Sequence, residues 1–375
     1  MSGAHSRLGP SSSHRWINCP GSMRLIERAL ADGLIKPGTP SAYAEEGTKA
    51  HELAAAMLQG KAWDKSEYDD EMLHHISDYV EFVQSLSQGY GTLPLVEQAV
   101  KYDDWVLGGW GTVDAVIVGQ SSIIVIDLKY GRGVAVDAVG NTQLLLYALG
   151  IYQGLDPEHR AKIVDISMYI YQPRLDSITE WHIRIGEFLD RAKTINKAAK
   201  TALTGYAPLA VGDWCRFCPA QPVCKAQYDH MTQVIGEDFD DLTTTADLLS
   251  PEIISKVLDA RSAIESWFRA VSDYATERLL DDHPVPGYKL VAGRSVRQWG
   301  DEQAAASVLK VLLGDDGAYT RKLLSPAQAE KALDKKDSVH LAGLIAKIAG
   351  SPTLVPSSDP RPDFSNISVD DFDNV

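Results

Sequence analysis

The chain contains 375 residues, of which 45% are apolar and 23% charged, and its formal net charge is −15 at pH 7. This length and composition allow a sizeable buried core in two domains, and the absence of an apolar run of about 18 residues excludes a membrane-spanning helix. The acidic excess argues against a general nucleic-acid coat protein, which binds by neutralising phosphates, but it leaves a nuclease open because the local field at a cleft governs binding there.

The N-terminal part of the chain predicts helices. We expect residues 1–13 to be flexible. They contain no apolar signal segment, so we expect the protein to be cytoplasmic. Apolar residues at helical spacing follow, and they predict three helices: one that starts near Pro20 and runs through 24–32, and two over 44–59 and 71–86.

Strand patterns dominate the next part. Two β-branched runs, 113–118 and 123–128, flank the turn sequence Gly119-Gln120-Ser121-Ser122, which is typical of a β-hairpin. This order of elements predicts an α/β fold with a mixed sheet flanked by helices. The predicted strands are 95–102, 110–118, 121–129, 164–172 and 178–185, and the predicted helices among them are 137–152 and 187–203.

Composition divides the chain into four parts. The first domain, 1–235, ends in a cysteine-rich segment and is followed by an acidic linker, 236–250. We expect a mainly helical C-terminal domain over 251–350. Many acids and prolines predict a disordered acidic tail over 351–375.

Three charged residues stand in the apolar hairpin: Asp114, Asp127 and Lys129. Because residues i and i+2 of a strand share a face, Asp127 and Lys129 are expected side by side, and antiparallel pairing brings Asp114 to the same end of the sheet. Two carboxylates can hold Mg²⁺ or Mn²⁺ through hard oxygen ligands, and a nearby lysine can orient an attacking water. The short pattern also fits two surface aspartates beside an unrelated lysine.

Other polar residues fall around this hairpin. Gln143 and Tyr147 are four residues apart on a predicted helix and therefore share a face. His51, on the predicted helix 44–59, is either a metal ligand, a solvated residue or a satisfied core histidine. Glu97 lies within the predicted strand 95–102 and, taken alone, is an edge residue.

Taken in order, these residues resemble the RecB-type branch of the PD-(D/E)XK nucleases. The matching motifs are GTxxH ending at His51, GxxD ending at Asp114, DxK at 127–129 and QxxxY at 143–147. The resemblance implies a restriction-endonuclease-like fold for the mixed sheet. It implies that the metal is held by His51, Asp114, Asp127 and the carbonyl of Leu128. It further implies that Lys129 serves the attacking water, that Gln143 and Tyr147 shape the DNA-facing side, and that Glu97 joins the catalytic residues.

Four cysteines form a second constellation. Cys215, Cys218 and Cys224 are closely spaced, and Cys19 lies about two hundred residues before them. Four thiolates suit either a tetrahedral zinc or an iron–sulfur cluster, and the spacing alone leaves both open. One cysteine before the core and CxxC-x5-C after it resembles the iron–sulfur staple of AddB-type helicase–nucleases and CRISPR-associated RecB-like nucleases. That resemblance implies a 4Fe-4S cluster, with zinc as the alternative.

Together, these resemblances imply a divalent-metal-dependent DNA exonuclease that hydrolyses phosphodiester bonds in phage recombination or DNA-end processing. The expected partner is linear DNA, at its ends or single-stranded, and the expected location is the cytoplasm of a bacterial host of the phage or prophage. An oligomer and a recombination or single-strand-binding partner stay open. Two other functions fit less of the sequence: a DNA-end-binding scaffold with little catalysis, and a zinc-stapled structural or adaptor protein.

Overall fold

The computed structural model describes residues 6–37, 42–131, 134–240 and 251–290. The chain divides into two compact units, Met1–Val291 and Ala292–Val375, and the described residues all belong to the first. The predicted tail 351–375 and most of the predicted C-terminal domain 251–350 lie outside the described residues. No helix of the described ranges combines the length and the apolar character that a bilayer crossing requires.

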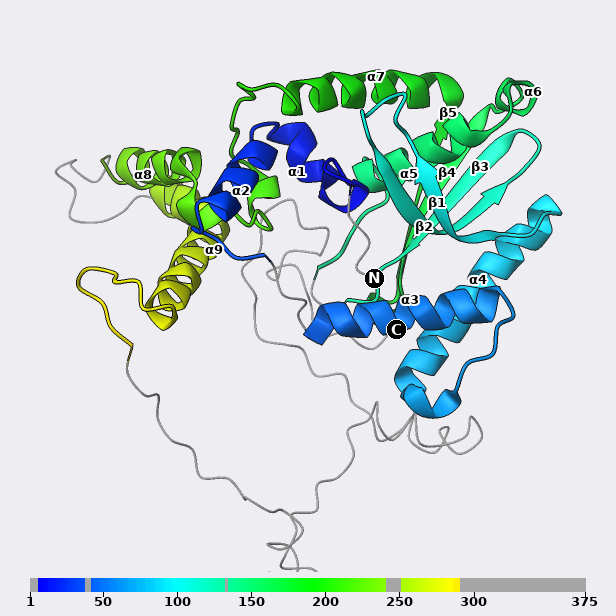
Figure 1. The fold of residues 1–375 in the computed structure, drawn as a ribbon, viewed down its shortest axis with the longest axis horizontal. Helices are drawn as coiled ribbons and strands as arrows, with labels where there is room; N and C mark the ends of the chain where they lie inside the picture. The colour runs from blue at the N-terminus through cyan, green and yellow to red at the C-terminus, as the bar shows by residue number, and fades with distance from the viewer. Residues whose placement is uncertain (1–5, 38–41, 132–133, 241–250, 291–375) are drawn as a thin grey trace, which may run out of the picture. The chain divides into compact units, whose positions relative to one another are not determined.

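A five-stranded sheet in the order β1-β2-β3-β4-β5 forms the centre of the unit (Figure 1). Only β3 and β4 run parallel; the other neighbouring pairs are antiparallel. The predicted mixed sheet and the predicted hairpin are therefore confirmed. The strands are β1 Leu95–Lys101, β2 Trp110–Val118, β3 Ser122–Leu128, β4 Asp165–Gln172 and β5 Ser177–Arg184.

The predicted helices of this part are present, with two short additions that the sequence did not indicate, α1 and α6. The helices up to residue 202 are α1 Ser13–Asn18, α2 Ser22–Ala31, α3 Ala42–Leu58, α4 Asp70–Tyr90, α5 Thr142–Gly154, α6 Pro157–Arg160 and α7 Ile185–Ala202. Helix α5 begins five residues later than predicted. Gly140 adopts a left-handed conformation, with φ at 75°, and the Asn141 side chain accepts the backbone N–H groups of Gln143 and Leu144, which fixes the helix start.

Helices cover both faces of the sheet. The face that carries Val116 and Val125 packs against α5 and α7, and the face that carries Ile117 and Ile126 packs against α3 and α4. Figure 1 shows these two pairs of helices on opposite sides of the strands. Strand β3 is buried from Ile123 to Leu128, which agrees with its nearly continuous apolar sequence. Burial on both faces supplies most of the driving force for this arrangement.

The N-terminal segment is ordered where the structure describes it, so the predicted flexibility of residues 6–13 is wrong. Leu8 is fully buried, and its carbonyl oxygen accepts a hydrogen bond from the Tyr102 hydroxyl. The Trp16 indole N–H donates to the carbonyl of Gly9. The segment has no periodic pattern, and its order comes from these long-range contacts with a buried tyrosine and tryptophan.

Two further helices follow the cysteine-rich segment: α8 Lys225–Asp240 and α9 Pro251–Leu280. Helix α8 covers the first five positions of the predicted acidic linker, and residues 241–250 lie outside the described ranges. Helix α9 packs against α8 and the short 3-10 turn Gln221–Val223, within the same compact unit as the sheet.

Candidate functional site

The β2–β3 hairpin brings Asp114 and Asp127 to one end of the sheet. Ala115 pairs with Ile126, and the two aspartates are the next positions beyond that pair. The backbone N–H of Leu128 donates to Asp114 Oδ2 over 2.8 Å. The Asp114 carboxylate is thereby held by the strand segment that separates Asp127 from Lys129.

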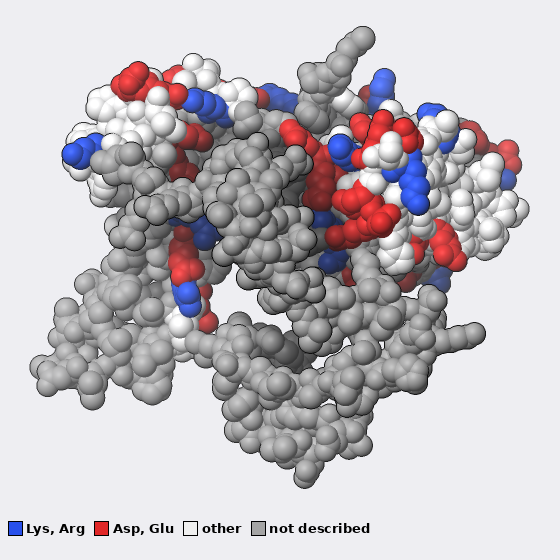
Figure 2. All heavy atoms as spheres, turned by 90° about the horizontal axis from the view of Figure 1, so that it is seen from below, with Lys and Arg blue, Asp and Glu red and all other residues white. Residues whose placement is uncertain are grey.

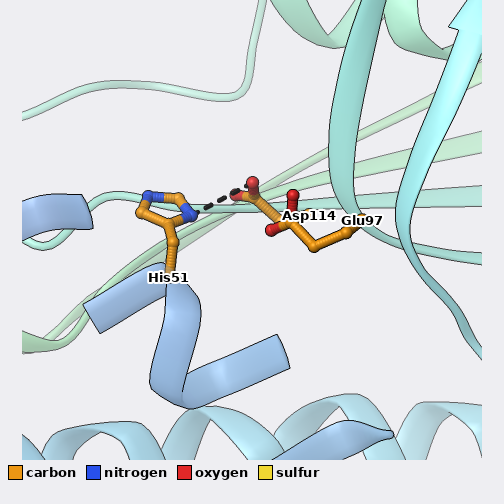
Figure 3. A group of neighbouring side chains, drawn as sticks. All are labelled: His51, Glu97 and Asp114. Atoms are coloured by element: carbon orange, nitrogen blue, oxygen red, sulfur yellow. Dashed lines mark ion pairs between the residues drawn. The ribbon is translucent and has the colours of Figure 1, made fainter. Parts of the chain in front are cut away.

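Three ligand-type side chains gather on one side of Asp114, and we refer to His51, Glu97 and Asp114 as the metal-side group. Their ligand atoms all lie within 4.8 Å of one another. The His51 Nδ1 atom lies 3.1 Å from Asp114 Oδ1. Figure 3 shows His51 reaching from its helix toward Asp114, with Glu97 beside it. An ion that binds oxygen at about 2.1 Å separates its ligands by about 3–4 Å, so these side chains need move little to share one.

Glu97 reaches this group through an irregularity in β1. Val96 pairs with Ala115 and Gln98 with Val113, and Glu97 between them has a φ of 51°. A non-glycine residue in this left-handed region is strained by about 1–3 kcal/mol. The register is the same on both sides of Glu97, so this residue stands opposite Asp114 and its carboxylate lies beside that of Asp114.

A second set of side chains lies on the α5 side, and we refer to Asp127, Lys129, Gln143 and Tyr147 as the lysine-side group. Lys129 Nζ lies 2.8 Å from Asp127 Oδ2 and donates to Gln143 Oε1 over 3.2 Å. The Gln143 amide nitrogen lies 3.0 Å from Asp127 Oδ1 and 3.1 Å from the Tyr147 hydroxyl. The residues of the DxK and QxxxY motifs therefore form one hydrogen-bonded network.

Asp127 is only 2% exposed, and its Oδ2 atom accepts no hydrogen bond of good geometry from the described residues. The Lys129 ammonium, 2.8 Å from that oxygen, is the charge partner of this buried carboxylate. Asp127 is not part of the metal-side group, whose donor set of two carboxylates and one imidazole fits a hard divalent cation such as Mg²⁺ or Mn²⁺.

The four cysteines line one small cavity of about 20 Å³. Cys19 is buried at the end of α1, and the backbone N–H of Ala210 donates to its sulfur over 3.3 Å. Gly21 permits this approach, because a Cβ atom there would lie 2.6 Å from the carbonyl oxygen of Ala207. The N-terminal cysteine thus reaches the segment that carries Cys215, Cys218 and Cys224.

No three of the four described sulfurs lie within 4.8 Å of one another. The described cysteines therefore share a pocket without forming a closed metal site, and their arrangement does not distinguish a zinc ion from an iron–sulfur cluster. Burial raises the thiol pKa of Cys215 and raises that of Cys218 to about 11. Without a bound cation these thiols therefore stay protonated at neutral pH.

A family profile described as "Protein of unknown function (DUF2800)" matches residues 5–362. The chain belongs to the DUF2800 family. Among solved structures, one described as "Crystal structure of SSO0001" is 15% identical over 60% of this chain and 90% of that chain, with a TM-score of 0.29. At this TM-score the likeness has no weight for fold or function.

In this DUF2800 member, burial and neighbouring charges shift the pKa values of residues in both groups of the site. Burial lowers the pKa of His51, but the hydrogen bond and charge of Asp114 outweigh that effect and raise it overall. Burial likewise opposes the charge on Lys129, but Asp127 raises the lysine pKa above its ordinary value. The pKa of Asp127 is raised because burial outweighs the attraction of Lys129. The Lys129 ammonium is thus retained at neutral pH inside the protein.

Two residues that support the site were not predicted. Arg174 follows β4, forms an ion pair of 2.7 Å with Glu46 of α3, and places its guanidinium 4.7 Å from the ring of Tyr130. Gln172 is buried and bonds Val134 and Val136 of the loop beyond Lys129. Neither residue belongs to a motif. The only feature of the sequence that indicates them is that both are polar and stand at the end of an apolar strand.

Proposed function

We propose that this protein is a divalent-metal-dependent DNA nuclease with a restriction-endonuclease-like core. The observation that supports it most is the meeting of the metal-side and lysine-side groups at one hairpin end, joined by the Leu128 N–H to Asp114. An acidic ligand set beside a partly buried lysine suits hydrolysis of a phosphodiester, in which charge develops on phosphate oxygens.

His51, Glu97 and Asp114 would hold the cation, with Asp127 as a further ligand. When bound, the cation would polarise the scissile phosphodiester as a Lewis acid. The chain's own contribution is to position groups around it. Asp127 keeps Lys129 charged and Gln143 aims it, so the ammonium would orient the attacking water and stabilise the developing negative charge. Tyr147 supports Gln143 from the next turn of α5.

We propose in addition that the four cysteines hold a 4Fe-4S cluster, with zinc as the alternative. The support is that all four cysteines line one pocket, together with the CxxC-x5-C spacing of the last three. Such a cluster would fasten Cys19 to the segment after α7 and so close a loop that contains the whole sheet. An exonuclease role in phage recombination or DNA-end processing, inside the bacterial host, belongs to the same proposal and is supported by the order of the motifs.

The test is cleavage of linear DNA by the anaerobically purified protein with Mg²⁺ or Mn²⁺, compared with the protein without added cation. We expect cation-dependent cleavage that Asp114→Asn abolishes. Asp190→Asn is the matched control, since Asp190 is an exposed aspartate of α7 paired with Lys193. Cleavage that persists in the Asp114→Asn variant would overturn the assignment of the site.

A further inference from the structure

An open groove of about 520 Å³ runs beside the lysine-side group. Its walls come from three stretches that are distant in sequence: residues 10–15, the loop 134–143 and the turn 213–217. Gln143, which bonds both Asp127 and Lys129, lies in its wall. The groove therefore joins the proposed reaction centre to the cysteine-rich segment.

Phe217 makes this groove unusual. Its side chain is 71% exposed, although it belongs to a short turn between two cysteines that line the neighbouring cavity. The Arg216 guanidinium lies 5.3 Å from the centre of its ring. A ring kept in solvent beside an arginine is a common stacking platform for an unpaired base, with the arginine available to a phosphate.

The charge of the groove is balanced, in contrast to the chain as a whole. Arg15 and Arg216 face Asp137 and Asp213 in its walls. Elsewhere the protein is acidic: Figure 2 shows acidic side chains gathered on the side of α3 and α4. One shallow pocket there is lined by Glu45, Glu46, Glu67 and Asp69 together with Lys49. A phosphate backbone would meet less repulsion in the groove than over α3 and α4.

We propose that the groove binds a single strand of DNA and leads it to the carboxylate site. Phe217 stacks on a base, Arg216 contacts a phosphate, and the strand then passes Gln143. A single strand is inferred rather than a duplex, because bases inside a duplex are stacked on one another and do not present a face to a side-chain ring. That the ligand is DNA rests on the proposed function. The location of the groove and the stacking on Phe217 rest on the lining residues and on the exposure of the ring.

The experiment is fluorescence anisotropy of a labelled oligothymidine of about 16 nucleotides, which matches the upper range of single-strand site sizes. The full-length protein is used without added Mg²⁺ or Mn²⁺, so that binding is measured apart from cleavage. Phe217→Ala is expected to weaken binding about fivefold or more, as the loss of one stacked base does. Arg216→Ala is expected to weaken binding and to reduce its salt dependence by about one phosphate contact.

Two matched controls lie outside the groove. Tyr206 is 98% exposed, so Tyr206→Ala removes a ring that is even more accessible than that of Phe217. Arg28 has a side chain that is 79% exposed, so Arg28→Ala removes one surface charge. Both variants are expected to bind like the wild type. Equal binding by Phe217→Ala and Tyr206→Ala would overturn the proposal, and so would displacement of the oligonucleotide by polyglutamate, which would indicate a general anion site.

The two proposals can fail separately. Phe217-dependent binding in a protein that never cleaves DNA would leave the groove assignment standing and overturn the nuclease. Cation-dependent cleavage, together with an oligonucleotide affinity that Phe217→Ala leaves unchanged, would support the nuclease and overturn the groove assignment.

Discussion

Asp114 accepts a hydrogen bond from the backbone N–H of Leu128 over 2.8 Å, across the β2–β3 hairpin. The resemblance to RecB-type nucleases implies a metal ligand at the Leu128 carbonyl, whereas the contact that the structure shows for Leu128 is this N–H to Asp114. Because a strand's backbone rather than a mobile side chain holds Asp114, the two halves of the site keep a fixed separation, as a preorganised metal centre requires.

Gln143 bonds both Lys129, the proposed catalytic lysine, and the buried carboxylate of Asp127. Gln143→Ala removes contacts to Asp127, Lys129 and Tyr147, and we expect DNA cleavage to fall about 10–100-fold while the fold survives, as for other residues that orient a metal site. Initial cleavage rates at saturating Mn²⁺ provide the measurement. Gln153→Ala is the matched control on the same helix, because Gln153 bonds Asp103 and Asp104 at the surface. Equal rates in the two variants would remove Gln143 from the site.

The strained backbone at Glu97 predicts a trade between stability and metal binding. Glu97→Gly relieves the left-handed conformation, which stabilises the folded protein, but glycine also adds entropy to the unfolded chain. We expect the net free energy of unfolding to rise by about 1 kcal/mol or less. The same change removes a ligand, so Mn²⁺ affinity should fall. Asp176→Gly is the control, since Asp176 has a φ of 49° in a turn after β4. It should gain similar stability and keep its Mn²⁺ affinity, as measured by urea unfolding and calorimetry.

The affinity for Mn²⁺ should rise with pH near neutrality. The pKa of His51 is raised in the metal-free protein, so the imidazole holds its proton to higher pH, and this proton competes with the cation. With one competing proton, the apparent dissociation constant falls about tenfold per pH unit below the His51 pKa and levels off above it. The raised pKa of Glu97 adds a second proton to the competition at lower pH.

Calorimetric titration of Mn²⁺ between pH 5.5 and 8.5, about the range in which a histidine titrates, checks this dependence. His51→Gln should bind Mn²⁺ more weakly and lose the dependence near neutrality. His74→Gln, which changes an exposed histidine of α4, should retain it. An affinity that is flat with pH in the wild type would show that His51 does not compete for the cation.

The cysteine cavity predicts that its four residues act as one unit. Each single Cys→Ser variant should lose the visible absorbance and the iron, about four atoms per chain in the intact protein, and should melt at a lower temperature. Cys19 is buried whereas the other three are partly exposed, so a mere packing role would make Cys19→Ser by far the most harmful. Equal loss of metal in all four variants supports the cluster, and a colourless protein with one zinc per chain would replace iron by zinc.

Much of the sheet could be predicted because its strands are apolar runs of the right length, and β3 is nearly continuous in Val and Ile. The proximity of Asp127 and Lys129 follows from the two-residue period of a strand. The left-handed φ of Glu97 could not be predicted, because no residue type in β1 indicates it. The order of residues 6–13 could not be predicted either, because it depends on hydrogen bonds from the side chains of Tyr102 and Trp16, and no local sequence pattern indicates these contacts.

The most direct test of the central claim is release of label from end-labelled linear DNA in Mn²⁺ by the wild type and by Lys129→Gln, at DNA concentrations that saturate both. The amide of Gln can still bond Gln143 but carries no charge, so we predict a large fall in kcat with unchanged Mn²⁺ affinity and an unaltered far-ultraviolet circular dichroism spectrum. Lys162→Gln, at an exposed lysine paired with Glu158, should cleave like the wild type. A folded, Mn²⁺-loaded wild type that releases no label, or a Lys129→Gln variant that cleaves at the wild-type rate, would contradict the account.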